Sequence, residues 1–284
     1  PGGSGARQAS SVSRYRSGPA DVSARCSGAP VSLLEVSPWF YALGVVAVLL
    51  TGISKSGFAG GVGSLAVPLM AMTVSPAVAA AIMLPILCLM DVLTIWAYRR
   101  QWDRRNLAVL LPGAAVGIAV GALTFDALDE HALRLVLGAI AIGFSAHYFL
   151  AQRGPREPRR GHPALGVVCG TVAGITSFVA HAGGPPVQFF LLPQRLDKSV
   201  FVGTSVVFFF LVNLAKVLPY AWLGQFAAGN LTTSLLLAPA APLGVWLGLR
   251  LHRMVSQALF YRLSYAMLVV AGAKLLWDGI SGSL

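Results

Sequence analysis

The chain has 284 residues, of which 56% are hydrophobic and only 11% are charged, and its mean hydropathy is +0.73. Soluble domains carry about a quarter charged residues, so this composition excludes an ordinary soluble domain and predicts a membrane protein. The formal net charge of +11 comes from short basic clusters between long apolar runs. That placement is typical of membrane orientation, and no nucleic-acid partner is expected.

Residues 1–37 are rich in Ser, Gly, Ala and Arg and contain no long apolar run. We interpret them as a disordered tail or a remnant of recombinant expression. The rest of the chain is expected to form a first membrane repeat at 38–151, a basic cytoplasmic linker at 152–163 and a second membrane repeat at 164–279.

Six apolar runs are each long enough to cross a bilayer, because about 20 helical residues span a hydrocarbon core of about 30 Å. The expected transmembrane helices are Pro76–Tyr98, Leu107–Phe125, Ala132–Leu150, Val200–Trp222, Leu231–Leu251 and Leu259–Trp277. Two further runs, Trp39–Thr73 and Leu165–Pro193, are interrupted near their middles by glycines and polar residues.

The first interruption, Thr51–Gly63, is rich in glycine and contains Lys55. A continuous helix is not expected there, since each glycine costs up to about 1 kcal/mol relative to alanine. Irregular backbone at membrane depth lines a cavity or is buried in protein. A helix beginning after the break and the charge of Lys55 both favour an anion. The alternative is that the glycines allow close helix packing and Lys55 reaches toward the membrane surface.

The second interruption, Gly174–Pro186, contains two adjacent glycines and two adjacent prolines. Proline lacks the N–H and clashes with the preceding turn, so the helix must break. Ser177 and His181 lie in this segment as hydrogen-bonding groups, although a single histidine can equally be structural. A neutral imidazole could donate to an oxyanion, and a protonated one could carry a coupling proton.

Ionisable and amide side chains also lie within the spans that follow the breaks. Asp91 is near the middle of its span, and Asn213 and Lys216 lie in the corresponding span of the second half. Asp91 is interpreted as a proton carrier, as a counter-ion to Lys55 or Lys216, or as a capping group. Glycines at spacing four, Gly113 to Gly121, indicate helix–helix contact.

The two halves share a pattern of residues. Gly52-Ile53-Ser54 corresponds to Gly174-Ile175-Thr176, and Asp91 and Tyr98 correspond to Asn213 and Tyr220 at the same offset. Each half therefore consists of a broken hairpin followed by three spans. An odd number of crossings in each half predicts inverted repeats, an architecture of secondary transporters. The basic loops 99–105 and 153–160 are expected to be cytoplasmic.

The segment GITSFVAHAGGPPVQFFLLPQRLDK, Gly174–Lys198, and the glycine-rich segment from Gly52 to Met70 resemble the two repeat signatures of the sulfite exporter TauE/SafE family. The resemblance covers nearly all of the chain from Trp39 to Trp277. It implies a multi-pass transporter of the bacterial inner membrane that moves sulfur-containing anions such as sulfite or organosulfonates.

The sequence thus predicts an all-α polytopic membrane protein that is a transporter and not an enzyme. An anion channel and an accessory or sensor subunit are the alternatives. No cofactor or metal site is expected, and the expected partners are a small sulfur oxyanion and the lipid bilayer, with protons and a second copy of the chain as further candidates. The expected substrate-binding residues are Ser54, Lys55, Ser56, Gly57, Gly60, Gly61, Ser177, His181, Gly183, Gly184 and Asn213, with Asp91 and Lys216 as coupling or charge-pair candidates.

Overall fold

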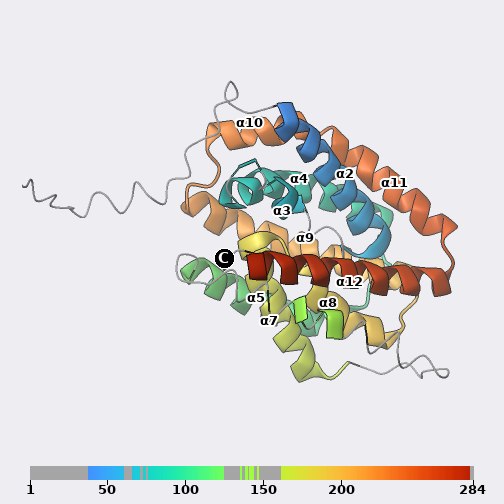
Figure 1. Cartoon of the computed structure of the whole chain (residues 1–284). Helices are drawn as coiled ribbons and strands as arrows, with labels where there is room; N and C mark the ends of the chain where they lie inside the picture. The colour runs from blue at the N-terminus through green and yellow to red at the C-terminus, as the bar shows by residue number, and fades with distance from the viewer. Residues whose placement is uncertain are drawn as a thin grey trace, which may run out of the picture.

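The computed structural model describes residues 38–60, 66–70, 73–74, 76–124 and 161–281, with isolated positions between 135 and 146. All regular structure in this part of the chain is helical (Figure 1). The helices are α2 (Pro38–Phe58), α3 (Ala66–Met70), α4 (Pro76–Ala97), α5 (Arg104–Leu123), α7 (Pro163–Ala180), α8 (Gly184–Leu191), α9 (Lys198–Trp222), α10 (Ala228–Leu237), α11 (Ala240–Met254) and α12 (Gln257–Ser281).

Six of these helices are long and apolar enough to cross a membrane, and α10 with α11 can form a seventh, bent span. The prediction of an all-helical, multi-pass membrane protein is therefore confirmed. The predicted tail 1–37, the span Ala132–Leu150 apart from isolated positions, and the loop 153–160 lie outside the described residues.

The prediction of a broken helix across Thr51–Gly63 is wrong in its first part, because α2 continues without interruption to Phe58. Gly52 packs against α11 so closely that a Cβ atom there would lie 2.9 Å from the Gly244 Cα. Close packing of two backbones outweighs the low helix propensity of glycine. The break follows at Ala59 and Gly60, which have φ of 59° and 83°.

The expected single span Leu231–Leu251 is instead two helices, α10 and α11, which meet at an angle of 45°. Pro239 lies in the junction between them. Proline lacks the N–H that a continuous helix requires there and clashes with the preceding turn. The second predicted break is observed between α7 and α8, where His181 adopts a left-handed conformation with φ of 51°.

The same local structure occurs twice at an offset of 122 residues. α2 ends at Phe58 and α7 at Ala180, and α4 begins at Pro76 and α9 at Lys198. The Tyr98 hydroxyl donates to the carbonyl of Ser56, and the Tyr220 hydroxyl donates to the carbonyl of Phe178, both at 2.6 Å.

The corresponding helices α4 and α9 run antiparallel. Asn213 bonds to Asp91, whereas Gly203, earlier in α9, packs against Gln101 beyond the end of α4. Residue numbers therefore rise along one helix as they fall along the other.

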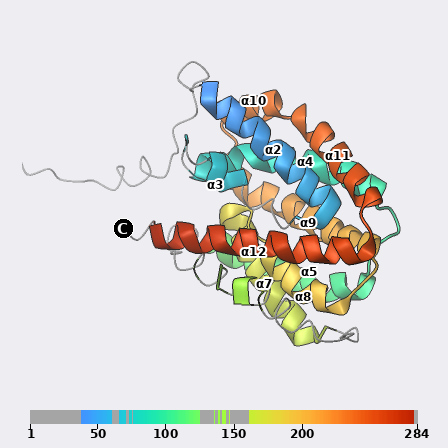
Figure 2. The same cartoon turned by 45° about the vertical axis from the view of Figure 1, so that its right-hand side comes forward.

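The two halves are interleaved. α2 packs along α11, and α5 packs along α7, where a Cβ at Gly174 would lie 3.0 Å from the Gly117 Cα. Figures 1 and 2 both show α2 and α11 side by side, with α12 crossing the molecule. The predicted role of Gly113, Gly117 and Gly121 in helix contact is confirmed.

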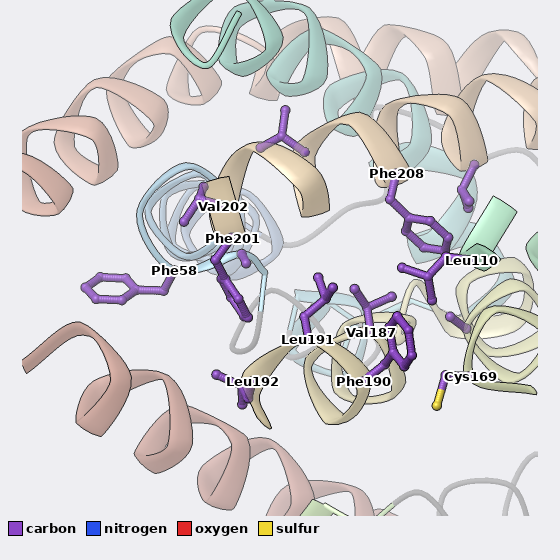
Figure 3. Packing of buried hydrophobic residues seen from close by; sticks show 14 of the residues in the cluster. Phe58, Leu110, Cys169, Val187, Phe190, Leu191, Leu192, Phe201, Val202 and Phe208 are labelled. Carbon is purple, nitrogen blue, oxygen red and sulfur yellow. The ribbon is translucent and has the colours of Figure 1, made fainter. Parts of the chain in front are cut away.

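The short helix α8 is held by apolar packing. Val187, Phe190 and Leu191 are buried in a cluster with Phe208 of α9 and Leu110 of α5 (Figure 3). This packing fixes the position of the α8 N-terminus, which follows the second break.

Candidate functional site

A buried ion pair joins α2 to α4. The Lys55 Nζ lies 2.6 Å from Asp91 Oδ1, and the Asn213 amide donates to Asp91 Oδ2 at 2.7 Å. All three side chains are buried. Of the interpretations that the sequence left open, the structure supports Asp91 as the counter-ion of Lys55. Asp91 and Asn213, which lie 122 residues apart, contact each other directly.

Lys216 has a different environment. Its Nζ lies 2.9 Å from the Ser177 carbonyl, 3.0 Å from the Ser177 hydroxyl and 2.8 Å from His181 Nδ1. The side chain is fully buried. No carboxylate from the described part of the chain lies within ion-pair distance of it. Within the described part of the chain, the polar partners of the buried Lys216 side chain thus carry no formal charge.

His181 connects the second break to the start of α4. Its Nε2 lies 2.9 Å from the carbonyl of Ala80. A carbonyl only accepts, so Nε2 carries the hydrogen, and Nδ1 is the acceptor that faces Lys216. The hydrogen bonds therefore fix one neutral tautomer of the imidazole.

A narrow cavity lies between the two breaks, and both of them contribute to its walls. It is lined by Thr51, Lys55, Gly60, Ala66, Val67, Met83, Leu87, Ser177, His181, Gly184, Phe209 and Asn213. The polar groups come from α2, α7 and α9, and the remaining wall is apolar. Such a combination is typical of a site for a small ligand.

The N-terminus of α8 also faces this cavity, since Gly184 is its first residue. The partial positive charge of a helix N-terminus favours an anion. Pro185 and Pro186 have no N–H, so the end of α8 offers its dipole and few hydrogen-bond donors.

Six of the predicted substrate-binding residues line the cavity: Lys55, Gly60, Ser177, His181, Gly184 and Asn213. Asp91 and Lys216 lie behind the lining and contact it through Lys55, Asn213, Ser177 and His181.

The other predicted residues lie elsewhere. The Ser56 hydroxyl donates to the carbonyls of Gly52 and Val245, and Gly57 packs against Gly248, so both belong to the contact with α11. The Ser54 carbonyl accepts from the Gly60 N–H and closes the end of α2.

Gly183 precedes α8 and packs against Ala173 and Phe209. Gly61 lies outside the described residues.

Sequence reasoning missed the apolar lining, including Met83, Leu87 and Phe209. A signal for them exists in the helical spacing. Leu87 precedes Asp91 by one turn, and Phe209 precedes Asn213 by one turn, so each lies on the same helix face as a polar residue of the site.

A family model described as "Sulfite exporter TauE/SafE" matches residues 44–275. The chain belongs to the sulfite exporter TauE/SafE family. The TauE/SafE region contains both breaks, both buried lysines and every residue that lines the cavity.

A curated TauE/SafE relative from Cupriavidus necator, named "Probable sulfite/organosulfonate exporter TauE", is 27% identical over 184 residues. The aligned region covers 63% of this chain and 70% of that protein. No solved structure matches this chain.

Proposed function

We propose that this protein is a secondary transporter that exports a small sulfur-containing anion, such as sulfite or an organosulfonate. The observation that carries the proposal is the charge around the cavity. Lys55 lines it, Lys216 lies behind its lining residues Ser177 and His181, and Asp91 is paired with Lys55 alone. With both lysines protonated the site has one excess positive charge, and a buried charge requires a counter-charge.

The lining supplies a fitting environment for a sulfonate or sulfite group. The Lys55 ammonium, the Ser177 hydroxyl and the Asn213 amide are donors for oxyanion oxygens. Ala66, Val67, Met83, Leu87 and Phe209 provide apolar surface that would exclude water and contact a short carbon chain.

In this proposal the two halves are inverted repeats, and access alternates around the two breaks. The antiparallel arrangement of α4 and α9 and the matching hydrogen bonds of Tyr98 and Tyr220 support it. The membrane is the bacterial inner membrane, with loop 99–105 on the cytoplasmic side because it is basic.

The test is uptake of radiolabelled sulfite, sulfate and sulfoacetate into proteoliposomes that contain the purified protein. We expect saturable uptake of at least one sulfur anion, accelerated by the same anion on the opposite side. The Lys216→Met variant should reduce uptake about tenfold or more, since interactions with a buried charge contribute about 1.5–3 kcal/mol. The matched control is Lys274→Met. Lys274 pairs with Asp278 on α12 and does not line the cavity.

The alternatives give different results. Flux that rises in proportion to the driving force, without saturation or counter-stimulation, indicates a channel. No flux of any sulfur anion contradicts the proposal and favours an accessory or sensor subunit. Equal uptake by wild type and Lys216→Met contradicts the charge argument.

A further inference from the structure

We propose that Lys216 is the site at which a proton binds together with the transported anion, so that the two cross the membrane together. This inference rests on the proposed function and adds the coupling ion and the residue that carries it. The two buried lysines differ in their surroundings. Lys55 has Asp91 as its counter-ion, and Lys216 has none among the described residues.

Burial without a counter-charge disfavours the ammonium form of Lys216. Its three partners, the two oxygens of Ser177 and Nδ1 of His181, are hydrogen-bond acceptors without formal charge. They can orient the ammonium group, but they do not neutralise it. Lys216 is therefore expected to release its proton when the cavity holds no anion and to bind a proton when an anion is present.

Among the described residues, the titratable groups around Lys216 do not provide another counter-charge. Lys55 on α2 repels it, and Asp91 on α4 already contacts Lys55 and Asn213. Cys88 is a thiol on α4. Tyr220, on the same helix as Lys216, donates its hydroxyl hydrogen to the Phe178 carbonyl.

His181 is unsuited to carry the proton itself. Its Nε2–H is engaged by the Ala80 carbonyl, and a second hydrogen on Nδ1 would remove the acceptor that faces the Lys216 Nζ at 2.8 Å. The geometry therefore favours the lysine as the proton site, with the imidazole as the acceptor that positions it.

The charge balance gives the proposal its physical advantage. In the empty state, the Lys55–Asp91 pair and the neutral Lys216 amine sum to zero charge. In the loaded state, the Lys216 ammonium and a monoanion add one positive and one negative charge, and the sum is again zero. The empty and the loaded site must each open alternately to the two sides of the membrane, and both are thus neutral when they do so. This avoids moving an unpaired charge through a low-dielectric region.

Because linkage is reciprocal, the anion must raise the affinity of Lys216 for a proton by the factor by which the proton raises anion affinity. Anion affinity should thus fall about tenfold per pH unit once the empty site has lost its proton. The proton binds the free amine of Lys216 on one side and is released on the other together with the anion, and no bond in the anion is broken.

The first experiment uses the full-length protein in proteoliposomes that contain a pH-sensitive dye. At equal starting pH on both sides, a gradient of the transported anion should drive protons in the same direction, with about one proton per monoanion. The Lys216→Arg variant keeps the positive charge but does not release it, because guanidinium is always protonated. It should exchange anion for anion but lose net transport and proton flux. Lys274→Arg is the control and should retain both.

A second, smaller substitution tests the same proposal if the Lys216→Arg variant does not fold. Ser177→Ala removes the hydroxyl acceptor of the ammonium, so half-maximal uptake should move to lower pH. The adjacent Thr176→Ala is the matched control, because the Thr176 hydroxyl bonds only to carbonyls of its own helix. Its pH profile should match that of the wild type.

The outcomes separate the two proposals. Sulfur-anion uptake with no proton flux and no pH dependence overturns the role of Lys216 and leaves the transport function intact. Proton flux that persists in Lys216→Arg, or a pH profile that does not move in Ser177→Ala, also overturns it. Absence of all sulfur-anion transport in the wild type contradicts the proposed function itself.

Discussion

At the scale of single residues, the Lys55–Asp91 pair has a cost and a benefit. Bringing both ions out of water is unfavourable, and the close contact with the additional amide of Asn213 offsets that penalty. Removing only one partner leaves the other charge buried and unpaired. The pair is therefore much more sensitive to single than to double substitution.

Asp91→Asn should lower the free energy of unfolding by about 3–5 kcal/mol, because Lys55 is left without a counter-ion. The measurement is thermal unfolding of the purified protein in detergent. The double variant Lys55→Met/Asp91→Asn is the matched control and should recover most of the loss. Equal destabilisation in both variants would contradict the pairing.

The two tyrosine hydrogen bonds predict equal behaviour in the two halves. Tyr98→Phe and Tyr220→Phe each remove a hydrogen bond to a buried carbonyl, which costs about 1–3 kcal/mol. The same unfolding measurement should give similar losses for both. Tyr41→Phe is the control, since the Tyr41 hydroxyl has no hydrogen bond to the described residues, and its effect should be small. A large loss at one tyrosine only would argue against equivalent local structure.

Polar residues at membrane depth were found from the sequence because they are costly there, and Lys55, Ser177, His181 and Asn213 do line the cavity. The sequence did not show that Ser56 and Gly57 face α11 and not the cavity. They depend on the continuation of α2 through the glycines, which is decided by the fit to α11. The sequence also did not show whether Asp91 pairs with Lys55 or with Lys216, because that depends on the distances in the folded protein.

At the scale of elements, the glycine contacts decide which helices can approach. Gly52→Ala would place a Cβ 2.9 Å from the backbone of Gly244 and push α2 from α11, which should cost about 1–3 kcal/mol. Unfolding in detergent measures the loss. Gly143→Ala is the matched control because Gly143 has no atom within 4 Å of the added Cβ. A loss no greater than that of the control would show that the interface can adapt.

The spans themselves were predictable, since their length and apolarity follow from the thickness of the bilayer. The bend between α10 and α11 was harder to predict. Proline is tolerated in transmembrane helices, so Pro239 alone did not distinguish a kink from a straight span. The break between α7 and α8 was easier to predict, because a helix cannot continue through two glycines followed by two prolines.

At the scale of the whole molecule, inversion of the repeats can be tested directly. The turns after α4 and α9 contain Arg100 and Gly224, which have φ of 67° and 68° and are exposed. Cysteines introduced at these positions, in a protein whose native cysteines are replaced by serine, should lie on opposite sides of the membrane. A membrane-impermeant maleimide applied to intact cells should label Gly224→Cys and not Arg100→Cys. Labelling of both or neither would contradict inversion.

The interleaving of the halves also affects how the protein is made. The Ser56 hydroxyl on α2 bonds to a carbonyl that lies 189 residues further along the chain. At about 5–20 residues per second, α2 leaves the ribosome on the order of ten seconds or more before α11 exists. During that interval the glycine face of α2 lacks its partner α11, whereas Asp91, the counter-ion of Lys55, follows much earlier on α4. The contact between α2 and α11 can therefore form only after α11 has entered the membrane.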